Sequence, residues 1–443
     1  MSRSFTARQA VTAAFVANAL RPVAGRRTAI ASFVAGWLTT ELAPQLLALT
    51  AGDTAAELLW RGRRGGHGAR GGRGARGGHG RRGGHGRRGG HGRHGRPDKV
   101  GLALAAGSMA ALGSMVIGAR ATADEIEGSL GRELGRSYLD RVESEEDAQG
   151  RLVGLRDWVR PFRLTNPEVE VIRDISYTEG GRRAKLDIYR PRGVDLQDAP
   201  VLVQVHGGGW VLGSKEQQGL ILMNRMAARG WVCVAMNYRL APKHPFPAQI
   251  IDVKKAIAWT RQHIGEYGGD PSYLVVTGGS AGGHLAALAA LTPGDVDYQP
   301  GFEGADTSVA GCVPFYGVYD MAGITGDKHA VVMRDWYLGP RVFRKDPTEH
   351  REEFVAASPL ARVNPDAPDF FVLHGANDTL VDVRQARAFV GALREVSKAT
   401  VTYHELRGTQ HAFEVFSSIR SQHTIRAVQR WLEWHHDQWR QRR

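Results

Sequence analysis

The sequence predicts an α/β fold whose central sheet is mostly parallel and flanked by helices. From residue 168 onward, short apolar runs of strand length alternate with runs that have helical length and spacing. Hydrophobic residues make up 42% of the 443 residues and charged residues 23%, values typical of a globular protein. Apolar strands buried on both faces and separated by helices are typical of parallel sheets. We therefore expect one α/β domain over residues 165–443.

Eight apolar runs are predicted as its strands. In chain order they are VEVIRDISY, AKLDIY, VLVQVH, WVCVAMN, YLVVTG, GCVPFYG, FFVLHG and VTYHEL. Helical patterns lie between most of the later strands, at residues 249–264, 281–291 and 383–396. Cys233 and Cys312 are the two cysteines, and both fall inside strand runs. We expect buried thiols there, and neither a disulfide framework nor a zinc site.

The net charge of +13 comes almost entirely from residues 61–96, which hold 12 Arg, 5 His, 17 Gly and no acidic residue. The other 407 residues carry only +1. A six-residue repeat over residues 65–94 contains too few apolar side chains to fold, so we expect a disordered tract. It lacks the aromatic residues that stack on bases, so nucleic acid is not an expected partner. A solvated linker and a contact for polyanions or anionic lipids both remain open.

Apolar segments flank this tract on both sides. Residues 100–119 contain no charge, and 20 such residues are enough for a helix to cross a bilayer. Residues 30–50 are also apolar but include Glu41 and Pro44. The regions expected before the α/β domain are an apolar helical region at 1–60, the tract at 61–96, an apolar helix at 97–123 and a charged, helix-prone region at 124–164.

The role of residues 30–120 is left open between a membrane hairpin and a helical pair packed on the α/β domain. The protein is accordingly expected to be either membrane-associated or cytoplasmic. A cleaved secretory signal is not expected, because the apolar stretch at residues 10–19 is short and weak.

A candidate nucleophile follows the fifth predicted strand. Gly278-Gly279-Ser280-Ala281-Gly282 lies directly between the strand YLVVT and the helix AGGHLAALAAL. In this strand–turn–helix context, G-x-S-x-G forms a sharp turn that raises the serine hydroxyl above the sheet. Small neighbours such as Gly278 and Gly282 let the backbone segments approach closely. The helix N-terminus adds N–H groups, including that of Ala281, for a developing anion.

Candidate oxyanion donors follow the third predicted strand, where the motif HGGGW comes after VLVQV. Its glycines free the backbone to direct N–H groups at an oxyanion. We expect the N–H groups of Gly207 and Gly208 to act together with that of Ala281. His206 and Gly209 are expected to support the motif.

A candidate acid and base follow the last two predicted strands. Asp378 comes after FFVLHG and His411 after VTYHEL, so the chain order is Ser, Asp, His, as this kind of site requires. Ser280 needs His411 as a general base, and His411 needs Asp378 to fix its tautomer and stabilise its protonated form. His404 is the rival base, but it lies within a strand, whereas a catalytic histidine needs the loop beyond.

Several stretches together resemble the hormone-sensitive-lipase family of α/β-hydrolases, also called bacterial family IV esterases. HGGGW and GGSAGG are similar to its oxyanion and nucleophile motifs, and YRLAPKHPFPA at residues 238–248 resembles Y-R-L-A-P-E-x-x-F-P-A. DTLVD from Asp378 resembles D-P-L-x-D, whose first Asp is the triad acid, and HAF from His411 resembles H-G-F. The likeness covers about residues 165–440 and implies the α/β-hydrolase fold.

The resemblance further implies a cap over the site, with candidates at residues 124–164 and at an insertion at about 320–359. Two positions depart from the family pattern. Gly279 stands where the family usually has Asp, so hydrogen bonding around the nucleophile will differ. Lys243 replaces the usual Glu after Y-R-L-A-P.

Other histidines and aromatic residues near the motifs are expected to have structural roles. The histidines are His244, His263, His284 and His329. Trp210, Trp336 and Tyr337 are candidates for the wall of the substrate pocket, although core packing is the commoner role of aromatic residues.

The sequence thus predicts a serine hydrolase that cleaves small-molecule carboxylic esters through Ser280, His411 and Asp378, with no cofactor and no metal. A thioesterase or amide hydrolase on the same scaffold remains an alternative, because fold and triad do not choose the leaving group. A membrane-tethered or polyanion-binding protein with a secondary hydrolase domain is another. Oligomeric state and acyl-chain length are not predicted.

Overall fold

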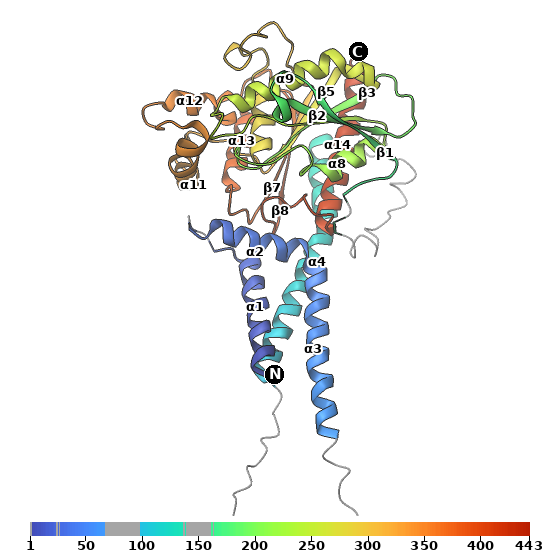
Figure 1. Cartoon of the computed structure of the whole chain (residues 1–443), viewed down its shortest axis with the longest axis vertical. Coiled ribbons are helices and arrows are strands. Elements are labelled where there is room, and N and C mark those ends of the chain that lie inside the picture. Colours follow the sequence, from blue (N-terminus) through green and yellow to red (C-terminus); the bar gives the residue numbers. More distant parts are fainter. Residues whose placement is uncertain are drawn as a thin grey trace, which may run out of the picture.

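The structure is a computed structural model and describes residues 2–23, 25, 27–66, 98–135, 138, 161, 162 and 164–443. It has two parts, an α/β domain and an N-terminal helical bundle that projects from one end of that domain (Figure 1). Most of the tract at 61–96 and most of the region at 124–164 lie outside the described residues.

The α/β domain is built on one eight-stranded sheet. Its strands are β1 (Val169–Ser176), β2 (Lys185–Pro191), β3 (Ala199–Val205), β4 (Val232–Met236), β5 (Gly269–Gly279), β6 (Gly311–Phe315), β7 (Asp369–Gly375) and β8 (Val401–Leu406). The strand order is β1-β2-β4-β3-β5-β6-β7-β8. β2 pairs antiparallel with β1 and with β4, and the remaining pairs are parallel. The predicted mostly parallel α/β fold is confirmed.

Helices cover both faces of the sheet, as the nearly continuous apolar strands require. One face packs against α9 (Ala248–His263), α10 (Ala281–Leu291) and α13 (Arg384–Val396). The other packs against α8 (Leu220–Ala228), α14 (Ile419–Gln441) and the C-terminal half of α4 (Lys99–Leu134). Short helical turns complete the domain: η2 (Gly181–Ala184), η3 (Ile264–Tyr267), η4 (Val296–Tyr298) and η6 (Pro359–Arg362).

The segment between β6 and β7, predicted as a cap insertion at 320–359, contains three helical elements. They are α11 (Lys328–Met333), η5 (Arg334–Phe343) and α12 (Arg351–Ala356). Figure 1 shows α11 and α12 at one side of the sheet. The Tyr337 hydroxyl of η5 donates a hydrogen bond of 3.0 Å to the Gly209 carbonyl oxygen, so this insertion touches the predicted oxyanion loop.

The N-terminal bundle contains α1 (Ser2–Leu20), α2 (Ala29–Glu41), α3 (Ala43–Gly66) and the first half of α4. The apolar segment at 30–50 is not one continuous helix, because the chain turns at Leu42, before Pro44. The first six residues of the tract at 61–96 continue α3. The predicted boundary between 97–123 and 124–164 falls inside α4, which runs without a break from the bundle onto the α/β domain.

Candidate active site

The nucleophile candidate Ser280 lies on the tight turn between β5 and α10, with φ +60° and ψ −120°. Glycines on both sides make this turn sterically feasible. A Cβ on Gly282 would lie 2.1 Å from the Val205 carbonyl oxygen, and one on Gly278 would lie 2.6 Å from the Gly282 carbonyl oxygen. A positive φ in a non-glycine residue is strained, and such strain occurs where the surrounding structure enforces it. The turn predicted from G-x-S-x-G is therefore present.

Asp378 and His411 lie together beyond the carboxyl ends of β7 and β8. His411 Nδ1 and Asp378 Oδ2 are 2.6 Å apart, and both side chains are buried. Asp378 Oδ1 also accepts hydrogen bonds from the backbone N–H groups of Leu380, at 2.9 Å, and Val381, at 2.8 Å. These bonds fix the carboxylate, which in turn fixes the imidazole with Nε2 left for chemistry.

The electrostatics of this pair favour an ionised acid. Burial alone would raise the pKa of Asp378, but His411 and His374 beside it hold that pKa well below its ordinary value. His374 Nε2 lies 3.4 Å from Asp378 Oδ2 and is within hydrogen-bond distance of the Val381 carbonyl, at 2.9 Å. A carboxylate that stays ionised can stabilise a protonated His411.

Ser280 and His411 approach the same edge of the sheet, although within residues 164–443 no hydrogen bond joins their side chains. The Ser280 backbone N–H donates to the Phe315 carbonyl at 3.0 Å. The next residue, Tyr316, packs its ring 4.4 Å from the His411 ring. Catalytic hydrogen bonds often tighten only when substrate is bound, so the geometry is compatible with a Ser–His–Asp triad.

The oxyanion loop differs in one detail from the sequence prediction. The Gly207 N–H donates a hydrogen bond of 2.6 Å to Gln218 Oε1, so this predicted donor is already paired. Gly208 and Gly209 follow with φ of +114° and +58°, conformations that favour glycine. The Ala281 N–H begins α10 and therefore has no acceptor one turn back in the helix. Gly208, Gly209 and Ala281 are the candidate donors that the structure supports.

His206 supports this loop from below. Its ring stacks on Tyr238 with centroids 4.2 Å apart, and its Nδ1 lies 2.7 Å from the Gly207 carbonyl oxygen. The side chain is buried, and burial lowers the pKa of His206 to about 4. A neutral, stacked histidine holds the loop and carries no charge into the site.

Several of the other predicted aromatic and histidine candidates have structural partners. The Trp210 indole is buried and donates to His284 Nδ1 at 3.2 Å, so it packs in the core. His404 Nδ1 lies 3.0 Å from Ser129 Oγ on α4, away from Asp378, and this rival base has a structural position. Trp336 is 61% exposed, whereas Tyr337 contacts the oxyanion loop.

Tyr316 and Glu414 are site residues that the sequence analysis did not identify. The Tyr316 hydroxyl, next to the His411 ring, donates a short hydrogen bond to the Glu414 carboxylate. Both side chains are buried, and burial raises the pKa of Glu414. Two features of the sequence could have identified them. Tyr316 directly follows β6, and Glu414 lies three residues after His411.

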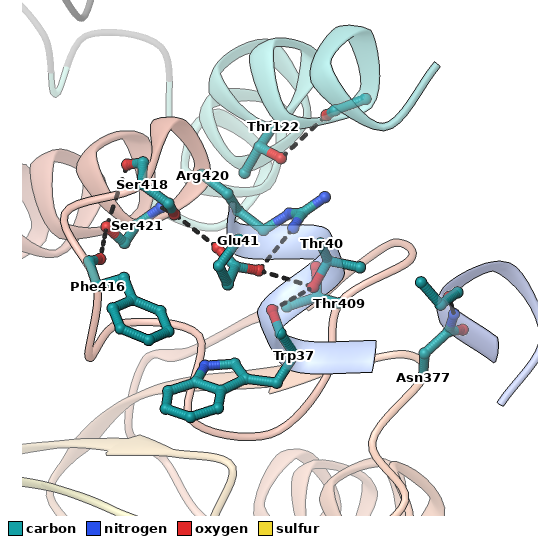
Figure 2. A network of polar contacts seen from close by, with 12 residues as sticks. Trp37, Thr40, Glu41, Thr122, Asn377, Thr409, Phe416, Ser418, Arg420 and Ser421 are labelled. Carbon is teal, nitrogen blue, oxygen red and sulfur yellow. Dashed lines mark hydrogen bonds and ion pairs between the residues drawn. The ribbon is translucent and has the colours of Figure 1, made fainter. Parts of the chain in front are cut away.

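Helix α2 lies against the loops that carry the acid and the base. Phe33 packs edge-on against the His411 ring at a centroid distance of 6.0 Å. The Trp37 indole N–H donates to the Ala412 carbonyl at 2.9 Å, and the Thr379 hydroxyl donates to the Ala29 carbonyl at 3.2 Å. Figure 2 shows Trp37 on α2 facing the C-terminal segment that contains Phe416.

Among the described residues that precede the α/β domain, α2 at residues 29–41 is thus the helix that reaches the site. The described start of the predicted cap region 124–164 instead continues α4 and packs on β8 and α14. The cause is the burial pattern of α4, where Ile126, Ser129 and Leu130 face the α/β domain.

A cavity of about 480 Å³ lies at the opposite edge of the sheet, near the start of β6 and β7, and includes Arg261, Lys398 and His435. It is remote from Ser280, because Ser280 follows the carboxyl end of β5. In the part of the chain that the structure describes, no group of three His, Cys, Asp or Glu side chains could hold a metal ion. Cys233 and Cys312 are buried free thiols whose pKa values are raised by burial.

A parallel sheet with a strained serine turn and a buried Asp–His pair at the same edge defines the α/β-hydrolase class. The family model described as BD-FAE matches residues 186–393. LipM of Mycobacterium tuberculosis, described as a probable carboxylic ester hydrolase, is 51% identical over 260 residues, 58% of this chain and 60% of LipM. Esterase LipC of the same organism is 39% identical over 304 residues, 65% of this chain and 75% of LipC.

Among solved structures, esterase 2 of Thermogutta terrifontis phosphonylated by sarin aligns with a TM-score of 0.51 and 26% identity. The match covers 59% of this chain and 93% of that esterase. The chain belongs to the hormone-sensitive-lipase-like family of α/β-hydrolases. It spans about three fifths of the length of the curated relatives LipM and LipQ.

Proposed function

We propose that the protein is a serine-dependent carboxylic ester hydrolase. The observation that carries the proposal is the buried His411–Asp378 pair, 2.6 Å apart, at the edge of the sheet where the strained Ser280 turn ends β5. The names of the relatives LipM and LipC support the same reaction class.

In the proposed reaction, Ser280 Oγ attacks the acyl carbon while His411 Nε2 takes the hydroxyl proton. The backbone N–H groups of Gly208, Gly209 and Ala281 stabilise the negative charge that develops on the carbonyl oxygen. Collapse of the tetrahedral intermediate breaks the bond to the alcohol, which leaves with the proton from His411. Water, deprotonated by His411, then cleaves the acyl-enzyme, releasing the acid and restoring the Ser280 hydroxyl.

Replacement of the nucleophile tests the proposal. Ser280→Ala is expected to lower kcat for p-nitrophenyl butyrate by at least about a thousandfold, because the acyl-enzyme cannot form. Ser176→Ala, at an exposed serine on β1, is the matched control and should retain activity. A fluorophosphonate probe should label the wild type on the tryptic peptide that contains Ser280. Activity of Ser280→Ala above a tenth of wild type would reject the assignment.

The leaving group is tested with the same enzyme. We expect kcat/KM to be highest for an oxygen ester in a matched series of ester, thioester and anilide with one acyl chain. The reason is that His411 protonates an alkoxide leaving group in the proposed reaction. A higher kcat/KM for the thioester or the anilide would assign the protein to one of the alternative classes.

A further inference from the structure

The surface of α4 within the bundle is apolar even where it is exposed. Between residues 100 and 119 the buried positions form a single stripe at alternating spacings of three and four residues: Gly101, Ala105, Ser108, Leu112, Met115 and Ala119. The remaining positions are half-buried or, as at Val100 and Ile117, exposed, and none of them is charged. A helix of a water-soluble protein normally carries charged and polar residues on its exposed face.

The other bundle helices also expose large apolar side chains. Twelve of the twenty exposed large apolar side chains in the described residues lie between residues 11 and 59 or at Val100 and Ile117. Phe15 on α1 and Leu49 on α3 are examples. The other eight exposed large apolar side chains are Phe162, just before the α/β domain, and seven residues within that much longer domain. Exposed apolar patches of this kind mark surfaces that contact a membrane, a ligand or another protein.

The dimensions of the bundle match a bilayer. The 20 uncharged residues of α4 are about 30 Å long as a helix, the thickness of a hydrocarbon core. α4 is the helix in the described chain that is long and apolar enough to cross a membrane, and only 28% of its apolar window is buried. A core helix of a soluble protein would be mostly buried. Figure 1 shows α1, α3 and α4 side by side, projecting away from the α/β domain.

Charged side chains on two helices of the bundle pair with each other. Arg8 of α1, whose side chain is 53% exposed, pairs with Asp53 of α3 at 2.8 Å, and Gln9 donates to the same carboxylate. Ionisable groups at membrane depth commonly pair with one another in this way. Helix α3 ends at Gly66, at the end of the bundle away from the α/β domain, and in the sequence the arginine-rich tract continues from there. Arginine-rich sequences suit anionic phospholipid headgroups.

We infer that the bundle of α1, α3 and α4 is embedded in a lipid bilayer, with α2 at the membrane surface beside the catalytic loops. Helix α2 runs across the end of the bundle in Figure 1. Its exposed stripe consists of Ile30, Val34 and Leu38. Phe33 and Trp37 lie on the face of α2 that packs against the α/β domain. Phe33 contacts His411, and Trp37 contacts Ala412.

This placement also assigns a substrate class, a step that rests on the proposed function. Because α2 contacts both the bilayer and the His411 loop, the catalytic edge of the sheet lies at the level of the lipid headgroups. An amphiphile in the bilayer holds its ester carbonyls at that level. The site is therefore suited to esters of amphiphilic molecules that are delivered from the membrane.

Flotation of the full-length chain with vesicles of phosphatidylethanolamine and phosphatidylglycerol tests the membrane contact. Leu49→Lys/Ile117→Lys places two charges on the exposed bundle surface and should lower the floated fraction at least tenfold. Val194→Lys/Val296→Lys, at exposed apolar positions of the α/β domain, adds the same charge and should float like wild type. Wild type that remains at the bottom, or a bundle variant that floats like wild type, overturns the inference.

Thermal unfolding in detergent would show whether the Leu49→Lys/Ile117→Lys variant folds. If it does not fold, a second measurement tests the inference on wild-type protein. A hydrophobic photoactivatable lipid should label wild-type protein on the tryptic peptide between Lys99 and Arg120, and not on peptides of α14. Absence of label from the α4 peptide overturns the inference.

The substrate class is tested with one long-chain ester presented in vesicles or as detergent-dispersed molecules. Wild type should show at least a fivefold higher kcat/KM for the vesicle form, and the bundle variant should lose this preference. Equal rates for both forms overturn the substrate class. Failure to cleave any soluble ester would reject the proposed function, whereas flotation and photolabelling would report the membrane contact independently.

Discussion

The Tyr316 hydroxyl occupies the space that a side chain at Gly279 would need: a Cβ on Gly279 would lie 2.7 Å from it. It leaves no room at position 279 for the Asp that the family usually has there. The same hydroxyl donates to the buried Glu414 carboxylate, so a carboxylate still lies close to the His411 ring. It comes from the segment after β8 and not from the strand before Ser280.

Restoring a side chain at Gly279 should therefore be harmful. Gly279→Ala is expected to destabilise the protein by about 1–3 kcal/mol, because Tyr316 is buried and cannot move away freely. Urea unfolding would measure the change. Gly304→Ala is the control, since no heavy atom lies within 4 Å of the added Cβ. Equal stability of the two variants would contradict the steric explanation.

Trp37 is expected to be a positioning residue for the catalytic base. Trp37→Phe removes the hydrogen bond to the Ala412 carbonyl while keeping much of the aromatic contact. The bond is worth about 1 kcal/mol, so a less well placed His411 should lower kcat roughly fivefold with KM within about twofold. Steady-state kinetics on a soluble ester distinguish this from general damage.

Trp259→Phe is the matched control, since Trp259 is half-buried on α9 and stacks on His263. Its kcat should equal that of the wild type. If Trp37→Phe instead raised KM about fivefold and left kcat unchanged, α2 would contribute to substrate binding alone.

The joint between bundle and α/β domain contains a buried ion pair. Glu41 at the end of α2 accepts hydrogen bonds from Arg420, at 2.8 Å, and Ser418, at 2.5 Å (Figure 2). Both charged side chains are almost completely buried. Glu41→Gln should cost about 3–5 kcal/mol of unfolding free energy, because the Arg420 guanidinium would remain buried without its counter-charge.

A double-mutant cycle measures this coupling. Glu41→Gln/Arg420→Met should recover much of the stability lost by Glu41→Gln, because no uncompensated charge remains. The exposed pair Arg387–Glu405 serves as a comparison, and its cycle should give at most about 1 kcal/mol. Additive losses for Glu41 and Arg420 would contradict the assigned coupling.

The sheet and the positions of Ser280, Asp378 and His411 could be predicted, because each follows an apolar strand and parallel strands end at one edge. The contacts of α2 could not. Trp37 and Ala412 are 375 positions apart in the sequence, and the apolar pattern of α2 does not specify its partner. The hydrogen bond between Gly207 and Gln218 could not be predicted either. The motif HGGGW suggests the Gly207 N–H group as an oxyanion donor, but in the structure this group already donates to Gln218 Oε1.

Stability should fall as the pH is lowered from 7 to 4.5, because buried histidines must remain neutral. His284 accepts a hydrogen bond from Trp210 at Nδ1 and lies 2.8 Å from the Ala357 carbonyl at Nε2, and burial lowers the pKa of His284 to about 4. The unfolded chain binds a proton near pH 6.5, so this contribution is complete above pH 6.5 and is lost towards pH 4. A shift of that size corresponds to about 3 kcal/mol.

The depressed pKa of Asp378 affects stability only at lower pH. Its contribution to the unfolding free energy is lost only when the pH falls below the ordinary aspartate pKa of about 4. Losses between pH 6.5 and 4.5 are therefore assigned to histidines. His284→Gln should flatten the decline of the unfolding free energy in this window, measured by urea titration in detergent at several pH values. His263→Gln, at a half-exposed histidine of α9, is the comparison variant. A slope for His284→Gln as steep as that of the wild type would show that other groups control the acid sensitivity.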